Sequence, residues 1–403
     1  MFRNKNTNKT KEKSRVFRVG IDARFFGLEN KGLGRYTNKL IQSLDKILLE
    51  DKSFKNEIKY YIFLPSNKFS EYKPTVKNIQ KIKADCKWYS WAEQVKFPFL
   101  LKKYNLDLMH FLHFNVPLLY RKKFIVTIHD LILFHYPTVK NTTLNKFTYF
   151  FKLLAYRFVI GSITKRAEKI IAISKFTRND LINTLKINKN KIEVIYEGSN
   201  FNQLLPKHSV KFNCKNIIKK YGIIKPYLLY IGNAYPHKNL DRLVLAFSKV
   251  NNNFTNNYQL VLVGKNDYFY KKLKIFIYKN NLNNILITDY ISDYEMSCLY
   301  QCSRLFVFPS LYEGFGLPPL EALVKGVPVL SSQRSSMPEI LGNNVQYFNP
   351  KDIKDMVRTM TTVLKNKKKN IYLTSSEKNY LQQKYNWKKM AKKINKLYIE
   401  QFK

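Results

Sequence analysis

The chain has 403 residues, which is more than one hydrophobic core usually serves, so two domains are expected. Its hydrophobic share of 45% is ordinary for a soluble globular protein, and no run of about 18 uninterrupted apolar residues predicts a spanning helix. The formal net charge of +43 is extreme and predicts attraction to polyanions, either nucleic acid or an anionic membrane. Because Lys, Asn, Ile, Phe and Tyr all have AT-rich codons, codon composition is an alternative source of this charge.

Residues 1–14 are basic and polar, and they are predicted to form a disordered arm. They lack the apolar region of a secretory signal, so a cytoplasmic protein is expected. The four cysteines fit reduced, buried thiols, because no second pair or histidine completes a metal-binding pattern around Cys298 and Cys302.

Short apolar strands alternate with helices from residue 15 to residue 200, which we interpret as a first Rossmann-like domain. The first helix is expected from about Arg35 to Leu49, after the loop that contains Gly32 and Gly34. Strands are expected at Phe17–Ile21, Ile58–Leu64, Asp107–Leu112, Phe124–His129, Lys169–Ser174 and Ile192–Tyr196. Continuous apolar strands of this kind are typical of parallel sheets covered on both faces.

The most apolar segment is Phe147–Ile163, in which Lys152 and Arg157 interrupt the hydrophobic run. Its pattern suits an amphipathic helix. Packing against a sheet is the favoured interpretation, and lying in a membrane interface is the alternative.

The same rhythm restarts after a polar connection, which predicts a second Rossmann-like domain over residues 201–385 and a terminal helix over 386–403. Strands are expected at Pro226–Gly232, Tyr258–Gly264, Asn284–Tyr290, Leu305–Ser310 and Val327–Ser332, with helices between them. The predicted fold class is therefore α/β, with two doubly wound domains facing a cleft. Ligands of such sheets bind at the carboxyl ends of the strands, so the loops there are the places to look for chemistry.

The loop after Leu305–Ser310 combines two glycines, Gly314 and Gly316, with the start of a helix at Pro318-Pro319. Glycine allows close approach of the backbone to a ligand, and the free amides of Phe315 and its neighbours would form an anion-binding site. Glu313 stands in this loop, and Glu321 should lie about two helical turns further on. Carboxylates accept hydrogen bonds from sugar hydroxyls, although Glu321 could equally complement the helix dipole.

Two basic residues, His237 and Lys238, lie at the start of the helix that follows Pro226–Gly232. Cations are unfavourable for a helix at this end, so an anionic ligand is the better explanation for them. Lys238 is a natural phosphate partner, and a solvated surface lysine is the alternative.

Histidines follow two strands of the first domain. His129 and Asp130 come after the apolar run FIVTI, and His110 and His113, in HFLHFNVP, also follow a strand. Each could be a core histidine. Three histidines at one sheet edge favour a substrate-binding cleft.

Together these segments resemble the retaining glycosyltransferases of family 4, which have the two-domain glycosyltransferase-B fold. SLYEGFGLPPLEA is similar to the signature of two glutamates separated by seven residues, and YIGNAYPHKNLDRLVLAF and IDARFFGLENKGLGRYT are similar to other blocks of the family. HFNVPLL followed by TIHDLI resembles the mannosyltransferase-like branch that builds bacterial surface polysaccharides, lipopolysaccharide among them.

The resemblance implies a hexosyltransferase that moves a hexose, with mannose favoured, from a nucleotide-diphosphate sugar to a glycan or lipid-linked saccharide. GDP-mannose is the favoured donor, and no cofactor or metal is implied. The first domain would bind the acceptor, the second the donor, and the terminal helix would cross back to the first domain. Clusters such as Arg121–Lys123 would add an anionic membrane surface as a further partner.

The resemblance also assigns roles. Glu313, His129 and Lys238 would be catalytic: Glu313 would bind a hydroxyl of the transferred sugar, His129 would contact the sugar near its sixth carbon, and Lys238 would neutralise the departing diphosphate. Glu321 would bind the ribose. The remaining substrate-binding residues would be Gly314, Phe315, Gly316, His237, Gly32, Gly34, Asp130, His113, Tyr290 and Ile291.

The phosphate loop departs from the family pattern, because His237 stands where many members have an arginine. Neutral histidine stabilises less developing charge than arginine does. Two rival functions remain, a nucleic-acid-binding basic protein and another nucleotide-sugar enzyme on the same fold. The scattered lysines argue against the first, and the glutamate pair with the Lys238 loop argues against the second.

Overall fold

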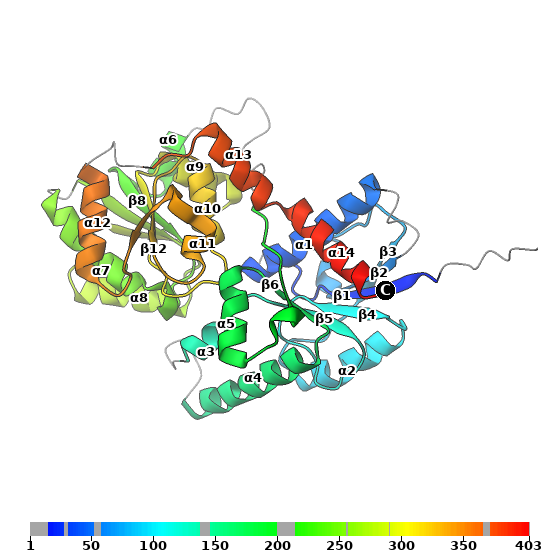
Figure 1. Cartoon of the computed structure of the whole chain (residues 1–403). Coiled ribbons are helices and arrows are strands. Elements are labelled where there is room, and N and C mark those ends of the chain that lie inside the picture. Colours follow the sequence, from blue (N-terminus) through cyan, green and yellow to red (C-terminus); the bar gives the residue numbers. More distant parts are fainter. Residues whose placement is uncertain are drawn as a thin grey trace, which may run out of the picture. The chain divides into compact units, whose positions relative to one another are not determined.

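The computed structural model describes residues 15–27, 31–51, 58–137, 146–199, 214–254, 257–289, 291–365 and 371–402 (Figure 1). The predicted arm over residues 1–14 and the predicted base contact at Tyr290 lie outside the described residues.

The first sheet has seven strands in the order β3-β2-β1-β4-β5-β6-β7. The pairings from β3 to β5, and that of β6 with β7, are parallel. Their bounds are β1 Phe17–Asp22, β2 Ile58–Leu64, β3 Ile79–Lys83, β4 Leu108–Phe111, β5 Phe124–Ile128, β6 Lys169–Ala172 and β7 Ile192–Val194. Every residue of β4 and β5 is buried, as expected for central strands that helices cover on both faces.

Helices connect these strands. They are α1 Lys31–Glu50, α2 Trp91–Lys102, α3 Ile132–His135, α4 Lys146–Arg166 and α5 Lys175–Leu185, with short 3₁₀ turns at Ser66–Lys68 and Lys189–Lys191. Gly32 and Gly34 lie in the first turn of α1, so the prediction that both glycines precede this helix is wrong.

The second sheet has six parallel strands in the order β10-β9-β8-β11-β12-β13. The strands are β8 Tyr227–Ile231, β9 Gln259–Val263, β10 Ile285–Thr288, β11 Leu305–Phe308, β12 Val329–Ser332 and β13 Gln346–Phe348. In both sheets the strand order reverses next to the first strand of the domain. The protein therefore consists of two Rossmann-like, doubly wound domains, as predicted, and such reversals are where these folds bind ligands.

The helices of this second half surround an extensive core of buried aliphatic and aromatic residues. They are α6 Cys214–Lys220, α7 Leu240–Asn253, α8 Tyr268–Lys279, α9 Asp293–Cys302, α10 Leu317–Val324, α11 Met337–Leu341, α12 Ile353–Lys365 and α13 Ser375–Lys384, with 3₁₀ turns at Pro236–Lys238 and Gly342–Asn344. Among the described residues of this core, none belongs to the last helix, α14 Trp387–Glu400.

All predicted strands are present, with ends shifted by two residues or fewer, but two edge strands escaped prediction. The first, β3, has the sequence IQKIK and is only half buried, and β13 has only three residues. An edge strand has one neighbour and more solvent, so it does not require the continuous apolar run on which the prediction depended.

The chain divides into two compact units, Met1–Val126 with Ala391–Lys403, and Thr127–Met390. The division falls within β5. In the first unit the end of α14 packs on the sheet, where His110 Nδ1 lies 2.6 Å from the Tyr398 hydroxyl. The candidate site described below is built within the second unit. The domain boundaries expected from the sequence stay a prediction.

Helix α4 differs from its predicted amphipathic pattern. One face is buried, through Tyr149, Tyr156 and Ile160, while several phenylalanines on the other face are exposed. The helix is therefore apolar on both faces rather than amphipathic.

Candidate active site

The loop between β11 and α10 is fixed by two serines of the segment after β12. The backbone amide of Glu313 donates to Ser335 Oγ at 2.9 Å. The hydroxyl of Ser336 donates to the carbonyl oxygens of Glu313 and Phe315, each at 3.0 Å. These bonds hold the backbone of the loop in one shape before any ligand arrives.

Both glycines of this loop are required by protein neighbours. A β-carbon at Gly314 would lie 2.0 Å from the carbonyl oxygen of His129, and one at Gly316 would lie 2.2 Å from the Met337 methyl group. Gly316 also has a φ of +94°, which disfavours other residues. The close approach at Gly314 is thus to the segment after β5. Contacts of the two glycines with a ligand stay a prediction.

Lys238 and Glu313 form an ion pair. Lys238 Nζ lies 2.5 Å from Glu313 Oε1, and the two side chains are 14% and 11% exposed. Lys238 ends the 3₁₀ turn Pro236–Lys238, which follows β8, while Glu313 follows β11. Because β8 and β11 are neighbouring parallel strands, their carboxyl ends bring the two predicted loops together.

His129 and Asp130 complete this cluster from the end of β5. His129 Nδ1 lies 3.2 Å from Glu197 Oε1, and the amide of Ile132 donates to Asp130 Oδ1 at 3.0 Å. Burial raises the pKa of the Asp130 carboxyl. The charge of Glu313 acts in the same direction, and those of His129 and Lys238 oppose it. Asp130 is therefore within electrostatic reach of the ion pair.

His237 is neutral. Burial lowers its pKa to about 2, and the charge of Lys238 lowers it further. Its Nδ1 is buried and has no hydrogen-bond partner among the described residues, and its ring stacks on Tyr235 at 5.9 Å. The interpretation of His237 as a cation at the helix start is therefore wrong, because burial prevents protonation. Lys238 is left as the cation of this loop.

Glu321 lies in the second turn of α10 and is 3% exposed. Lys325 follows four residues later, and the charge of Glu321 opposes the lowering of the Lys325 pKa by burial. A carboxylate complements the helix dipole chiefly in the first helical turn, and Glu321 lies beyond that turn. Its contact with a ribose stays a prediction.

The prediction that three histidines converge on a substrate is wrong for His110, and a substrate contact of His113 stays a prediction. His110 is fully buried in β4 and bonds Tyr398, so it is a core histidine of the first unit. His113 belongs to the same unit, and its ring lies 4.0 Å from that of Phe114 and 5.2 Å from that of Phe25. The alternative that the sequence left open, a core histidine, is correct for His110.

The other predicted residues are placed as follows. Gly32, in the first unit, is exposed, and Gly34 is buried. Ile291 is 5% exposed and packs in the core of the second domain, and its contact with a nucleotide base stays a prediction.

A hydrogen-bonded network beside Glu313 was missed by the sequence interpretation. The Tyr312 hydroxyl bonds Asp180 of α5, whose carboxylate also lies 2.8 Å from His135 Nε2. The amide of Leu131 donates to the same hydroxyl at 3.2 Å. Tyr312 precedes Glu313 in the sequence, but nothing in the pattern indicates Asp180, because the contact joins residues 132 positions apart.

A second missed contact involves Glu339 of α11. Its carboxylate accepts from the amides of Lys175 and Phe176, at 2.7 and 2.8 Å, at the start of α5. A carboxylate is favourable at this end of a helix. Together with Ser174, whose hydroxyl donates to the Gly314 carbonyl at 2.7 Å, Glu339 joins the start of α5 to the second domain.

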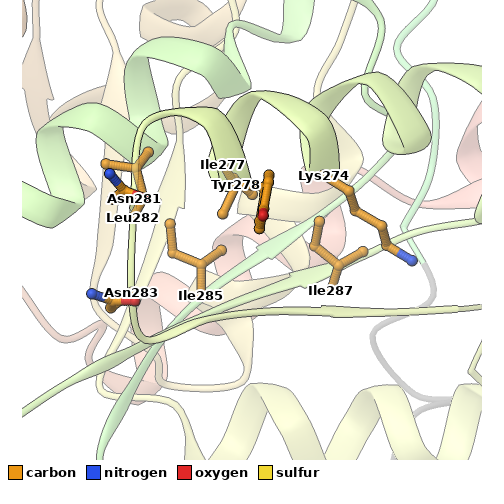
Figure 2. A pocket seen from close by; sticks show the side chains of 8 residues that line it. All are labelled: Lys274, Ile277, Tyr278, Asn281, Leu282, Asn283, Ile285 and Ile287. Atoms are coloured by element: carbon orange, nitrogen blue, oxygen red, sulfur yellow. The ribbon is translucent and has the colours of Figure 1, made fainter.

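A surface pocket of about 530 Å³ lies elsewhere in the second unit (Figure 2). Side chains from the end of α8, from the following turn and from β10 line it, among them Ile277, Tyr278 and Ile285. None of the predicted site residues contributes to it, so it is not the candidate active site.

Within the described residues, no group of three or more His, Cys, Asp or Glu side chains could hold a metal ion. The cysteines are free, but only Cys298 is buried, whereas Cys302 is exposed. The expectation of buried thiols is therefore wrong for Cys302. Partial burial of the sulfur atoms and contact with the Cys214 thiol raise the pKa of Cys298 to about 11 and that of Cys302 to about 12, although Cys302 as a whole residue is exposed.

Two family models match the chain. Residues 57–203 match the model described as Glycosyltransferase Family 4, and residues 215–380 match the one described as Glycosyl transferases group 1. The matches fall on the two halves that carry the two sheets. Together with the fold they make this chain a glycosyltransferase with the two-domain glycosyltransferase-B fold.

Curated relatives are similar over part of the chain. The O-antigen chain mannosyltransferase RfbU of Salmonella typhimurium is 27% identical over 66% of this chain and 67% of its own length. The serotype-specific mannosyltransferase WbdA of Escherichia coli is 30% identical over 50% of this chain, and the match spans only 25% of that protein.

Solved structures share the fold at low sequence identity. Sucrose-phosphate synthase from Thermosynechococcus elongatus superposes with a TM-score of 0.71 at 17% identity, covering 96% of this chain and 99% of that one. HepE from Anabaena, solved with UDP-glucose, gives 0.68 at 14% identity, covering 95% and 99%. WaaG, a glycosyltransferase involved in lipopolysaccharide biosynthesis, gives 0.66 at 13% identity, covering 94% and 99%.

Proposed function

We propose that the protein is a retaining, metal-independent hexosyltransferase that uses a nucleotide-diphosphate sugar. The observation that carries this proposal is the Lys238–Glu313 ion pair beside Asp130, at the carboxyl ends of neighbouring parallel strands. One cation and one carboxylate at 2.5 Å, both partly exposed, offer a diphosphate and a sugar hydroxyl their preferred partners at the same point.

The departing nucleoside diphosphate develops negative charge, and Lys238 would stabilise that charge in the transition state. The backbone amides of Gly316 and Leu317 would add donors, because the first amides of a helix have no partner within it, whereas Pro318 and Pro319 have no N–H group to offer. The donor would separate Lys238 from Glu313, so that the phosphate takes the ammonium group and the sugar takes the carboxylate. Neutral His237 would contribute a hydrogen bond rather than a charge.

The sugar would become oxocarbenium-like as the bond to phosphate breaks, as in glycoside hydrolysis. His129, oriented by Glu197, would contact the sugar. In a retaining reaction the acceptor hydroxyl attacks from the side that the phosphate leaves. The phosphate oxygen then takes the hydroxyl proton.

The names of the relatives support the substrate classes. RfbU and WbdA are mannosyltransferases, and RfbU is named for the O-antigen chain. We therefore favour GDP-mannose as the donor and a growing glycan or lipid-linked saccharide of a surface polysaccharide as the acceptor. Such an acceptor would place the protein in the cytoplasm, at the inner membrane face.

A panel of nucleotide sugars tests this proposal by thermal shift and by release of nucleoside diphosphate. A donor at 100 times its dissociation constant should add about 2.7 kcal/mol to the free energy of unfolding. GDP-mannose is expected to give the largest shift, and Glu313→Gln is expected to lower turnover by about 100-fold or more.

The matched control is Glu295→Gln. Glu295 forms an ion pair of the same 2.5 Å length with Lys220, at the surface of the same unit. This variant should keep both donor binding and turnover. The proposal fails if no nucleotide sugar binds at millimolar concentration, or if the two glutamine variants have the same turnover.

A further inference from the structure

Helix α4 carries an exposed stripe of large apolar side chains on the face opposite its buried one. The α4 stripe consists of Phe147, Phe150, Phe151, Leu154 and Phe158, which are 81%, 56%, 67%, 45% and 68% exposed. Their spacing of three, four, seven and eleven residues places them along one side of a helix. Taking about 200 Å² for a whole phenylalanine, the four rings expose on the order of 500 Å². That is near the upper end of what a monomeric protein leaves in water.

The stripe is not explained by the packing of the unit. Tyr149, Tyr156, Ile160 and Ile163 form the other side of α4 and are buried. A helix that is hydrophobic all round lies in a core or in a membrane. No residue in the described part of the chain packs over the outer side of α4. Exposure of this apolar surface to water is therefore unfavourable.

Charge around the stripe selects the partner. No acidic residue occurs between Asp130 and Glu168, a stretch of 37 residues that holds six Lys and Arg. Lys152, Arg157 and Lys165 of α4 are exposed. Arg157 lies near the middle of α4, and its guanidinium group is 5.7 Å from the centre of the Phe134 ring of α3. Phenylalanine rings edged by lysine and arginine fit the boundary between acyl chains and anionic headgroups.

We propose that α4 is a membrane-docking helix, which lies in the plane of an anionic bilayer with the α4 stripe among the upper acyl chains. It would not cross the bilayer, because Lys152 and Arg157 interrupt its sequence, and none of the described helices is long and apolar enough to span. The docking itself does not depend on the proposed function. Only its purpose does: docking would bring the protein to the membrane surface that holds a lipid-linked acceptor.

A second copy of the chain is a poorer occupant of the stripe. Stable interfaces bury about 800 Å² on each partner, which exceeds what the stripe offers. Two α4 helices would also bring like charges together, because neither contributes a carboxylate.

The test uses the full chain and vesicles of phosphatidylcholine, with and without about one third phosphatidylglycerol. The wild type should sediment with the anionic vesicles. The triple variant Phe150→Ser, Phe151→Ser, Phe158→Ser should lose about 10³-fold in vesicle affinity, because each buried ring is worth about tenfold and three are removed. All three rings are more than half exposed, so the variant should fold.

The matched control is Ile275→Ser with Tyr278→Ser on α8, two apolar residues of the same unit that are 56% and 83% exposed. It should bind vesicles like the wild type. A Phe158→Trp variant gives a second measurement: its added fluorescence should be quenched by lipids brominated in the acyl chains, whereas Tyr278→Trp should not be.

Equal vesicle affinity of the triple variant and the wild type would overturn the proposal, and so would a shift from dimer to monomer without any change in vesicle affinity. The proposal would also be overturned if the triple variant lost more affinity for single-stranded DNA than for vesicles. That result would assign the α4 stripe to nucleic acid. Failure of this proposal is separable from failure of the proposed function, because donor-induced thermal shifts should be the same in the triple variant and the wild type.

Discussion

Two clusters in this molecule each pair a basic side chain with carboxylates, but one is fully buried and the other is partly exposed. In the first unit, Arg24 lies 2.7 Å from Asp22 and 2.8 Å from Glu93, and its side chain is 1% exposed. In the second unit, Lys238 lies 2.5 Å from Glu313, and both side chains are partly exposed.

The Arg24 cluster satisfies itself. The guanidinium group also donates to the Cys86 carbonyl and lies 3.9 Å from the Phe97 ring, while Asn115 donates to Glu93. Burial opposes the charge of Arg24, but Asp22 and Glu93 together raise its pKa above the ordinary value. Every group is already paired, so this cluster stabilises the fold and has nothing to offer a ligand.

The Lys238 cluster is balanced but open. One cation faces one carboxylate, Asp130 is held towards its neutral form by burial, and His237 keeps an unpaired buried nitrogen. A ligand could therefore take the place of one member of the ion pair and could bond the unpaired nitrogen of His237. The comparison suggests that the first cluster governs stability and the second governs activity.

The largest effect is expected at Arg24. Arg24→Met leaves two buried carboxylates without their cation, so the free energy of unfolding should fall by about 3–5 kcal/mol. Denaturant unfolding measures this change. The control is Arg15→Met, because the Arg15–Asp107 pair spans 2.6 Å but Arg15 is 77% exposed, and its loss should cost about 0–1 kcal/mol. Equal losses in the two variants would contradict the comparison.

Lys238→Met should have the opposite effect to Arg24→Met, with a large loss of turnover and a small loss of stability. Without the ammonium group, turnover should fall by about 10²–10³-fold, because the charge that develops on the leaving diphosphate loses its partner. Stability should change much less than in Arg24→Met. Steady-state kinetics and unfolding of the same preparation measure both. Lys220→Met, which breaks a surface ion pair, is the control and should be silent in both. A Lys238 variant that unfolds but keeps its turnover would reverse the assignment.

Gly314→Ala sharpens the comparison by moving the loop without touching a charge. The added β-carbon would meet the His129 carbonyl at 2.0 Å, so the loop must shift, at a cost of about 1–3 kcal/mol in stability. Turnover should fall as well, because Glu313 is the adjacent residue. Thermal unfolding and kinetics measure the two effects. In Gly161→Ala the added carbon meets nothing within 4 Å, and that variant should gain about 0.5–1 kcal/mol.

The smallest effect is a pH dependence at Asp130. Burial raises its pKa in the folded state, so its contribution to stability is fully present below the pKa of the unfolded chain and is lost as pH rises through the folded pKa. Ionised Asp130 would also repel an anionic donor. Donor affinity should therefore decline as pH rises through this pKa.

Donor titrations over a pH series measure that decline. Asp130→Asn should flatten the profile, although His129, Glu313, Lys238 and Tyr312 also act on this site electrostatically. A profile of unchanged slope in the asparagine variant would assign the pH dependence to one of these neighbours.

The sequence alone determined the two doubly wound domains and the loops that carry Lys238 and Glu313. Apolar runs such as FIVTI are buried on both faces, so their pattern identifies them without knowledge of their neighbours. The same applies to the start of α10, where proline and glycine act locally.

Only the tertiary structure decided which of these residues meet. His110 lies inside β4 and packs on Tyr398, whereas His129 follows β5 and faces Glu197. The burial of His237, the Tyr312–Asp180 bond and the exposed face of α4 were equally hidden in the sequence. The physical reason is that side-chain pairing and burial depend on contacts between residues far apart in the chain. Strand and helix patterns, by contrast, depend on residues that are close together in the sequence.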